Sequence, residues 1–138
     1  MNRRELQQLS HQRRRDAKVL LDAGNYSGAY YLLGYAVECG IKAAIARNVQ
    51  RHDFPDLNTV RDSYKHNLEG LLKTAGLWPH LTTAMAASQS LQVNWAVVKD
   101  WDVESRYTLS ISEVRARDFY SASTSKTTGF LSWLRNYW

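Results

Sequence analysis

Residues 24–47 read GNYSGAYYLLGYAVECGIKAAIAR, and between Tyr26 and Ala46 this run of apolar and small side chains contains two charged ones. These are Glu38 and Lys42, four residues apart with the acid first, the spacing and order that favour an ion pair on one face of a helix. A helix that is apolar on all sides is expected at the centre of a protein, surrounded by other elements. The Glu38–Lys42 pair would then be partly desolvated, so it marks a specific buried contact rather than a large source of stability.

Helical patterns continue on the N-terminal side of this segment. Leucine and alanine side chains recur at steps of three and four residues between Arg3 and Ala23, which predicts a first amphipathic helix over that range. Gly24 and Asn25 end it, because both residue types favour the turn that follows a helix. A break this short predicts that the two helices fold back on each other as an antiparallel hairpin.

The rest of the chain predicts shorter helices separated by turn residues. Residues 47–65 have the composition of a surface loop, and residues 101–112 are expected as a second loop. Three helices are predicted around them: residues 68–75, capped by Asn67 and ended by Gly76; residues 81–99, opened by Pro79; and a last helix from near Ser112 to residue 138, weakened by Thr127, Thr128 and Gly129. Residues 1–138 are therefore predicted to form one all-α domain, an up-and-down bundle of four to five helices with a long central hairpin.

Composition places the chain among ordinary globular proteins. It has 138 residues, 44% of them hydrophobic, which suffices for one core. Its single cysteine, Cys39, lies within the apolar segment, so no intramolecular disulfide can form and a reducing cytoplasm is the expected location. The longest wholly apolar run, residues 29–37, is far shorter than the roughly 20 residues that span a membrane, and the N-terminus has no signal-peptide pattern. We expect neither secretion nor membrane insertion.

Positive charge is concentrated at the N-terminal end. The chain has a net charge of +5, and residues 1–18 contain six basic side chains against two acidic ones. Arg13, Arg14 and Arg15 form the densest part of this segment. Clustered arginines on one helix are typical of a surface that contacts the phosphate backbone of a nucleic acid. A basic helix face that serves solubility alone explains the same residues.

Several common kinds of catalytic site have no motif in this sequence. The four histidines are His11, His52, His66 and His80, and no two of them lie four apart or beside a cysteine motif, so no metal site is expected. The glycines are spread through helical patterns rather than gathered in a phosphate-binding loop, and no serine lies in a nucleophile elbow. No cofactor is expected.

Three short segments of the chain carry a family resemblance. They are Gly24-Asn25-Tyr26 followed by Tyr35-Ala36-Val37-Glu38-Cys39 and Lys42-Ala43; His66-Asn67-Leu68 with Leu71-Leu72 one turn later; and Trp101 with Arg106-Tyr107 after four intervening residues. In this order they resemble the HEPN family, with Asn67 in place of the usual aspartate. The resemblance implies an all-helical domain that pairs with a second copy around a shared groove. Members of that family partner small nucleotidyltransferases or act as RNase toxins in prokaryotes.

One hypothesis from this resemblance is metal-independent RNA cleavage. Catalytic HEPN members carry an arginine followed after four to six residues by a histidine, which acts as general base on a ribose 2′-hydroxyl while the arginine stabilises charge on the phosphorane. That spacing occurs at Arg4 with His11, at Arg47 with His52 and at Arg61 with His66. Arg61 and His66 are the candidate catalytic pair, because they lie where a loop enters a helix.

The second hypothesis, which we favour, is binding without catalysis. In catalytic members the motif lies beside the last helix, where this chain has Arg106, and the positions at which a histidine would follow hold Ile111, Ser112 and Glu113. Arg106 can instead clamp a phosphate while Tyr107 stacks on a base. Two tryptophans, Trp95 and Trp101, are further stacking candidates, although packing in the core explains them equally well.

The expected function is therefore that of a non-catalytic nucleotide- or RNA-binding HEPN protein, the partner of a minimal nucleotidyltransferase in a prokaryotic toxin–antitoxin or defence system. The alternative is a metal-independent endoribonuclease toxin that uses Arg61 and His66. A homodimer is expected in either case, because the five tryptophans and eight tyrosines are many for a chain of this size and aromatic residues are enriched at interfaces.

Overall fold

The computed structural model describes residues 1–49 and 53–138. Within these residues the regular structure is entirely helical, which confirms the predicted all-α class. The elements in chain order are α1 (Arg3–Asp22), α2 (Tyr26–Asn48), α3 (Leu57–Ser63), α4 (Leu68–Thr74), α5 (Trp78–Ala87), α6 (Gln89–Val98), the 3-10 helix η1 (Val103–Tyr107), α7 (Glu113–Thr124) and α8 (Phe130–Leu134).

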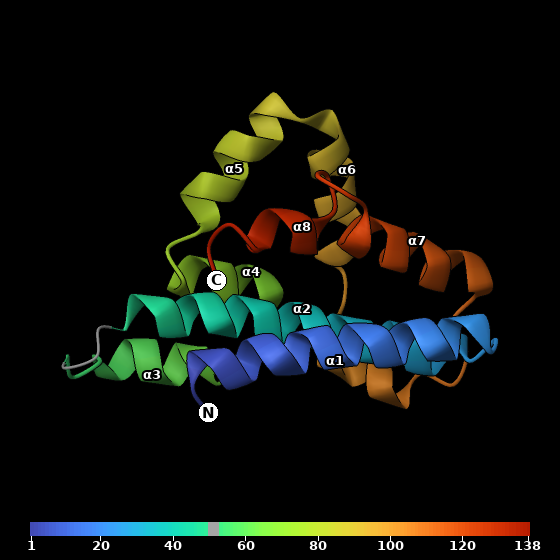
Figure 1. Cartoon of the computed structure of the whole chain (residues 1–138), viewed down its shortest axis with the longest axis horizontal. Helices are drawn as coiled ribbons and strands as arrows, with labels where there is room; N and C mark the ends of the chain where they lie inside the picture. The colour runs from blue at the N-terminus through green and yellow to red at the C-terminus, as the bar shows by residue number, and fades with distance from the viewer. Residues whose placement is uncertain (50–52) are drawn as a thin grey trace.

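The first two helices form the long antiparallel hairpin that the sequence predicts (Figure 1). Asn2 begins α1 through a capping box: its Oδ1 accepts from the Glu5 N–H at 2.9 Å, and the Glu5 carboxylate accepts from the Asn2 N–H at 2.8 Å. Gly24 completes the turn with φ +79°, a left-handed conformation that glycine adopts without strain. Ser10 joins the two helices, because its buried Oγ donates to the Ala36 carbonyl at 2.6 Å.

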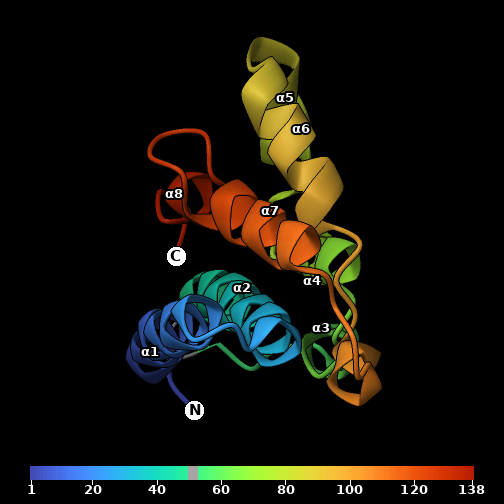
Figure 2. The same cartoon turned by 90° about the vertical axis from the view of Figure 1, so that its right-hand side faces the viewer.

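α2 is the centre of the molecule. α1 packs along one side of it, α7 and α8 lie across another, and α4 and η1 cover a third (Figures 1 and 2). Of its 23 residues, 13 are buried, which explains why its sequence is apolar around the whole helix. α5 and α6 form a second hairpin that projects away from this body (Figure 2). No helix in the described part of the chain is long and apolar enough to cross a membrane.

Two glycines of α2 allow tryptophan rings to lie directly against the helix backbone. A Cβ atom on Gly34 would come within 1.8 Å of Trp101, and one on Gly40 within 2.8 Å of Trp138. Each contact fixes a segment that is distant in sequence, since Trp101 precedes η1 and Trp138 follows α8. Both indoles are buried and belong to the core.

The segment 47–65, expected as a loop, contains the short helix α3. Asp56 begins it, because one carboxylate oxygen accepts from the Thr59 N–H at 3.0 Å and the other from the Thr59 hydroxyl at 2.6 Å. None of its seven residues is buried, so the helix leaves no hydrophobic period in the sequence. Residues 50–52, which include His52 of the Arg47–His52 spacing, lie outside the described residues.

The single helix expected over residues 81–99 is in fact two helices. Ser88 separates them: its backbone is extended, with φ −142°, and its Oγ accepts from the Leu91 N–H at 3.2 Å to begin α6. A serine hydroxyl competes in this way with the helical hydrogen bonds of the backbone. The apolar pattern continues across Ser88, which is why the sequence suggested one helix.

The last helix is also interrupted. Ser112 caps α7, since its Oγ accepts from the Arg115 N–H at 3.1 Å, and the helix ends at Thr124. Thr127 then adopts φ +65°, and a Cβ atom on Gly129 would lie 2.5 Å from a backbone oxygen of the preceding turn. Residues 127–129, which were expected only to weaken one long helix, therefore separate α7 from α8.

Replacing Gly34 by alanine is expected to destabilise the protein, although alanine favours a helix over glycine by about 1 kcal/mol. The new methyl group would overlap the rigid indole of Trp101, and overpacking of this kind costs about 1–3 kcal/mol or more. Gly28→Ala is the matched control in the same helix, because its methyl group would meet only the end of the Leu20 side chain, at 3.3 Å. Urea unfolding measures both variants, and equal midpoints would contradict the Trp101 contact.

Candidate functional site

A buried carboxylate lies at the middle of the fold. Glu38 of α2 is 2% exposed, and its Oε1 accepts from Lys42 Nζ at 2.7 Å, the contact that their four-residue spacing predicts. The Nδ1 atom of His66 lies 3.0 Å from Oε1 and 3.1 Å from Oε2 of the same carboxylate. Because an ionised carboxylate only accepts hydrogen bonds, Nδ1 carries the hydrogen and donates it. We call Glu38, Lys42 and His66 the Glu38 cluster.

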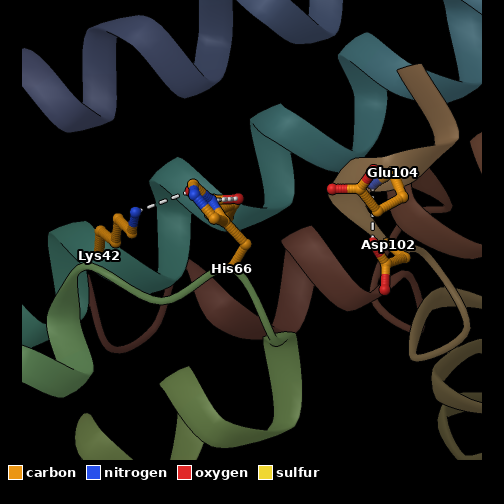
Figure 3. Close-up of polar contacts among 5 residues, drawn as sticks. Lys42, His66, Asp102 and Glu104 are labelled. Carbon is orange, nitrogen blue, oxygen red and sulfur yellow. Dashed lines mark hydrogen bonds and ion pairs between the residues drawn. The ribbon is translucent and has the colours of Figure 1, made fainter. Parts of the chain in front are cut away.

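His66 reaches Glu38 because of the turn between α3 and α4. Asn67 caps α4, as the sequence predicts, with its Oδ1 accepting from the Gly70 N–H at 2.7 Å. The leucines of α4 are fully buried and hold that helix against α2. The residue before the cap is therefore brought beside α2, where His66 and Lys42 both contact the Glu38 carboxylate (Figure 3). No local pattern connects His66 with a glutamate 28 residues earlier, so the sequence did not predict this partner.

The candidate catalytic pair is not joined by a polar contact. Arg61 lies in the last turn of α3 and is exposed, and its side chain forms no hydrogen bond or ion pair within residues 1–49 and 53–138. His66 directs its Nδ1 to Glu38 instead, and its side chain remains 44% exposed. A histidine that a buried carboxylate orients through Nδ1 has the arrangement of a general base whose other nitrogen faces a substrate.

The candidate ligand-binding residues Arg106 and Tyr107 lie at the exposed end of η1. Tyr107 is 69% exposed, and the Arg106 guanidinium carbon is 4.8 Å from the centre of its ring, a cation–π contact. The neighbouring Tyr107, and to a lesser extent Glu104 at 4.0 Å, raises the pKa of Arg106, so this side chain is a permanent cation. Asp102 begins η1 by accepting from the Glu104 N–H at 2.7 Å (Figure 3).

The two tryptophans considered as stacking residues have no free ring face. Trp101 is 3% exposed and lies against Gly34 and two tyrosine rings of α2. Trp95 is 5% exposed and packs between aromatic rings of α5 and α8. A base cannot stack on a ring whose faces are covered, so core packing accounts for both residues and Trp101 is removed from the candidate ligand contacts.

The positions at which a catalytic histidine would follow Arg106 have structural roles. Ile111 is buried, and its N–H donates to Ser27 Oγ at 3.0 Å. Ser112 is the cap of α7, and Glu113 accepts from Arg117 Nε at 2.8 Å. No histidine therefore lies at the expected spacing from Arg106.

The basic residues of α1 divide into paired and unpaired ones. Arg13 forms an ion pair with Asp16 at 3.4 Å, whereas Arg14 and Arg15 form none within the part of the chain that the structure describes. Arg135, which follows α8, lies close to Arg14: burial, and after it the Arg14 charge, lowers the pKa of Arg135. Arg135 was absent from the predicted basic patch because it lies at the other end of the chain.

Other reactive groups do not form a site. Among the described residues, no group of three or more histidine, cysteine, aspartate or glutamate side chains converges to hold a metal ion. Cys39 is buried beside Glu38, and burial raises the pKa of its thiol to about 11. A thiol of that pKa is protonated at neutral pH and is a poor nucleophile.

Comparisons of the chain with protein-family models, with curated proteins and with solved structures gave no match.

Removing the Glu38 carboxylate is expected to cost about 3 kcal/mol of unfolding free energy, because Glu38→Ala leaves the Lys42 ammonium and the His66 ring without their buried partner. Glu69→Ala is the matched control, since Glu69 pairs with Lys73 at the same spacing, 3.1 Å apart, but on the surface. Exposed pairs of that kind contribute about 0–1 kcal/mol. Chemical denaturation that gives the two variants the same midpoint would contradict a buried role for Glu38.

Proposed function

We propose that this chain is a non-catalytic nucleotide- or RNA-binding protein of the HEPN type. The observation that carries the proposal is the exposed pair Arg106 and Tyr107, whose guanidinium and ring are stacked at 4.8 Å. A cation beside an accessible aromatic ring provides a phosphate ligand and a base-stacking surface next to each other. Neither side chain is part of the buried core, so neither is explained by packing.

The segment that carries this pair is anchored to α2 on both sides, which favours binding because less motion is lost when a ligand is held. The buried Trp101 fixes the start of the segment against Gly34. Ser27 of α2 fixes its end, since its Oγ accepts from the Ile111 N–H at 3.0 Å and donates to the Leu109 carbonyl at 3.3 Å. The η1 segment is thus fastened to α2 at both ends.

The family part of the proposal rests on the resemblance, and the contacts among the three resembling segments support it. Glu38 of the first segment accepts a hydrogen bond from His66 of the second. Trp101 of the third lies against Gly34, in the same helix as the first. Residues that the resemblance groups by sequence are therefore neighbours in space.

The α5–α6 hairpin is the surface through which we propose that two copies pair. Residues 74–98 contain no aspartate, glutamate, lysine or arginine, in a chain whose net charge is +5, and the hairpin projects from the body (Figure 2). Two copies of a positively charged protein repel each other least through an uncharged surface. Light scattering at micromolar concentration tests the dimer, and a monomer mass would contradict it.

The proposed partner enzyme, a minimal nucleotidyltransferase of a toxin–antitoxin or defence system, is inferred from the resemblance alone, and an unrelated gene neighbourhood would argue against it.

Arg106→Ala is expected to weaken the binding of ATP or of a fluorescent single-stranded oligoribonucleotide about tenfold or more, because a hydrogen bond to a charged group contributes roughly 1.5–3 kcal/mol. Arg117→Ala is the control, since it removes the same charge from an exposed arginine that is already paired with Glu113. Fluorescence anisotropy measures the affinity for the oligonucleotide, and calorimetry measures the affinity for the nucleotide. Equal affinities for the two variants would remove Arg106 from the site.

A metal-independent ribonuclease is the second candidate, and one observation favours it: the contact of Nδ1 of the partly exposed His66 with buried Glu38 at 3.0 Å. With the ring oriented in this way, Nε2 is the atom that would take the proton of a 2′-hydroxyl. Arg61 would stabilise the phosphorane only if it turned toward His66, a contact that the structure does not contain.

Incubation of the purified protein with single-stranded RNA in EDTA is expected to give no cleavage, because no histidine follows Arg106 at the catalytic spacing. EDTA silences contaminating metal-dependent nucleases without affecting a histidine–arginine mechanism. Cleavage that persists in EDTA and disappears in folded His66→Ala, while Lys73→Ala retains it, would reverse the order of the two candidates.

A further inference from the structure

The residues after α8 dock against both helices of the long hairpin. The Trp138 ring lies against Gly40 of α2, and its backbone oxygen accepts from the Arg3 guanidinium at 2.5 Å. The ring of His11 meets the Trp138 ring edge-on, with centroids 5.3 Å apart. Arg135 lies over the same indole, its guanidinium carbon 6.0 Å from the ring centre. Docking of Trp138 therefore brings Arg135 to the basic face of α1.

His11, Arg14, Arg15 and Arg135 form what we call the cationic cluster. Each of the three arginines is close enough to His11 to lower its pKa, although burial of the imidazole contributes most. Burial, and after it the Arg14 charge, lowers the pKa of Arg135 in the same way. Like charges held together from two ends of the chain are unfavourable unless an opposite charge compensates them.

No carboxylate of α1 compensates this cluster. Glu5 is engaged in the capping box at the start of the helix. Asp16 pairs with Arg13 at 3.4 Å, and Asp22 accepts from Lys18 at 2.6 Å. Within residues 1–49 and 53–138, no ion pair includes a member of the cationic cluster. The excess positive charge is therefore available to an anion from outside the chain.

We propose that the cationic cluster is a binding site for a phosphate group, held by Arg14 and Arg135 together. Guanidinium groups bind phosphate oxygens through charge-assisted, often bidentate hydrogen bonds, and two of them from different elements approach one anion from two sides. The phosphate belongs either to a nucleic-acid backbone or to a free phosphate-bearing molecule. The site stands apart from the Arg106–Tyr107 pair and uses none of its residues, so it does not depend on the proposed function.

Binding at this site is coupled to protonation of His11. Besides burial, the charges of Arg135 beyond α8 and of Arg14 and Arg15 on the same helix lower the pKa of His11 and so oppose its protonation. A bound phosphate reverses that opposition, so the pKa of His11 is higher in the complex than in the free protein. Affinity for a phosphodiester, whose charge is constant in this range, therefore rises as the pH falls through the range in which His11 titrates.

The first arm of the test measures the binding of RNA. Arg14→Gln/Arg135→Gln is compared with Lys99→Gln/Lys126→Gln, a control that removes the same charge from two exposed lysines outside the cluster. Binding of a fluorescent single-stranded oligoribonucleotide is followed by anisotropy as a function of salt. Loss of the one phosphate contact that the two arginines share flattens the slope of log affinity against log salt by about 0.7 in the first variant, and the control keeps the slope of the parent protein. Circular dichroism checks that both variants are folded.

The second arm measures the binding of inorganic phosphate. The signal of the His11 ring proton is followed by NMR as a function of pH, with and without phosphate. Phosphate is expected to move the His11 titration upward in the parent protein and not in the double arginine variant. A response to phosphate without a change in the RNA salt slope assigns the site to a free phosphate-bearing molecule, and the reverse assigns it to the polymer. An unchanged slope together with an unchanged His11 titration overturns the proposal, whatever Arg106→Ala does to nucleotide binding.

Discussion

Contact between tryptophan rings and the bare backbone of α2 is the constraint on which the rest of the structure depends. Gly34 and Gly40 are six residues apart, so the two contacts lie about 9 Å apart along the helix axis and on different faces. Trp101 occupies the first position and Trp138 the second. A side chain at either glycine would push the ring, and the segment attached to it, away from the helix. The fold thus depends on the lack of a side chain at Gly34 and at Gly40, in its most buried helix.

Each of these rings also positions a charged group. Trp101 fixes the segment that carries Arg106 and Tyr107, and Trp138 holds the turn that brings Arg135 to α1. Each exposed arginine therefore lies within a few residues of a buried tryptophan that anchors its segment to α2.

The charges of the Glu38 cluster are buried and have a different role from those of the exposed arginines. A carboxylate that is 2% exposed requires compensation, and Lys42 and His66 supply it from its own helix and from the turn before α4. Buried ion pairs add little net stability, but removal of one partner is costly, so such a pair fixes which elements meet. The contact joins the turn before α4 to α2, beside the buried leucines that hold α4 there. It also orients His66, the residue on which the ribonuclease alternative rests.

Local sequence patterns determined the all-α class, the limits of the first hairpin, the Glu38–Lys42 contact and the cap at Asn67. Each of these depends on residues within about one helical turn, where spacing and side-chain chemistry act directly. Sequence was less informative at α3, at Ser88 and at residues 127–129, where a single capping or turn residue interrupts or starts a helix without changing the hydrophobic period. Only the tertiary structure decided that His66 meets Glu38, that Trp101 is buried rather than free to stack, and that Arg135 joins Arg14. Those contacts join residues far apart in the chain, and their geometry follows from how closely the packed elements approach, which no local pattern encodes.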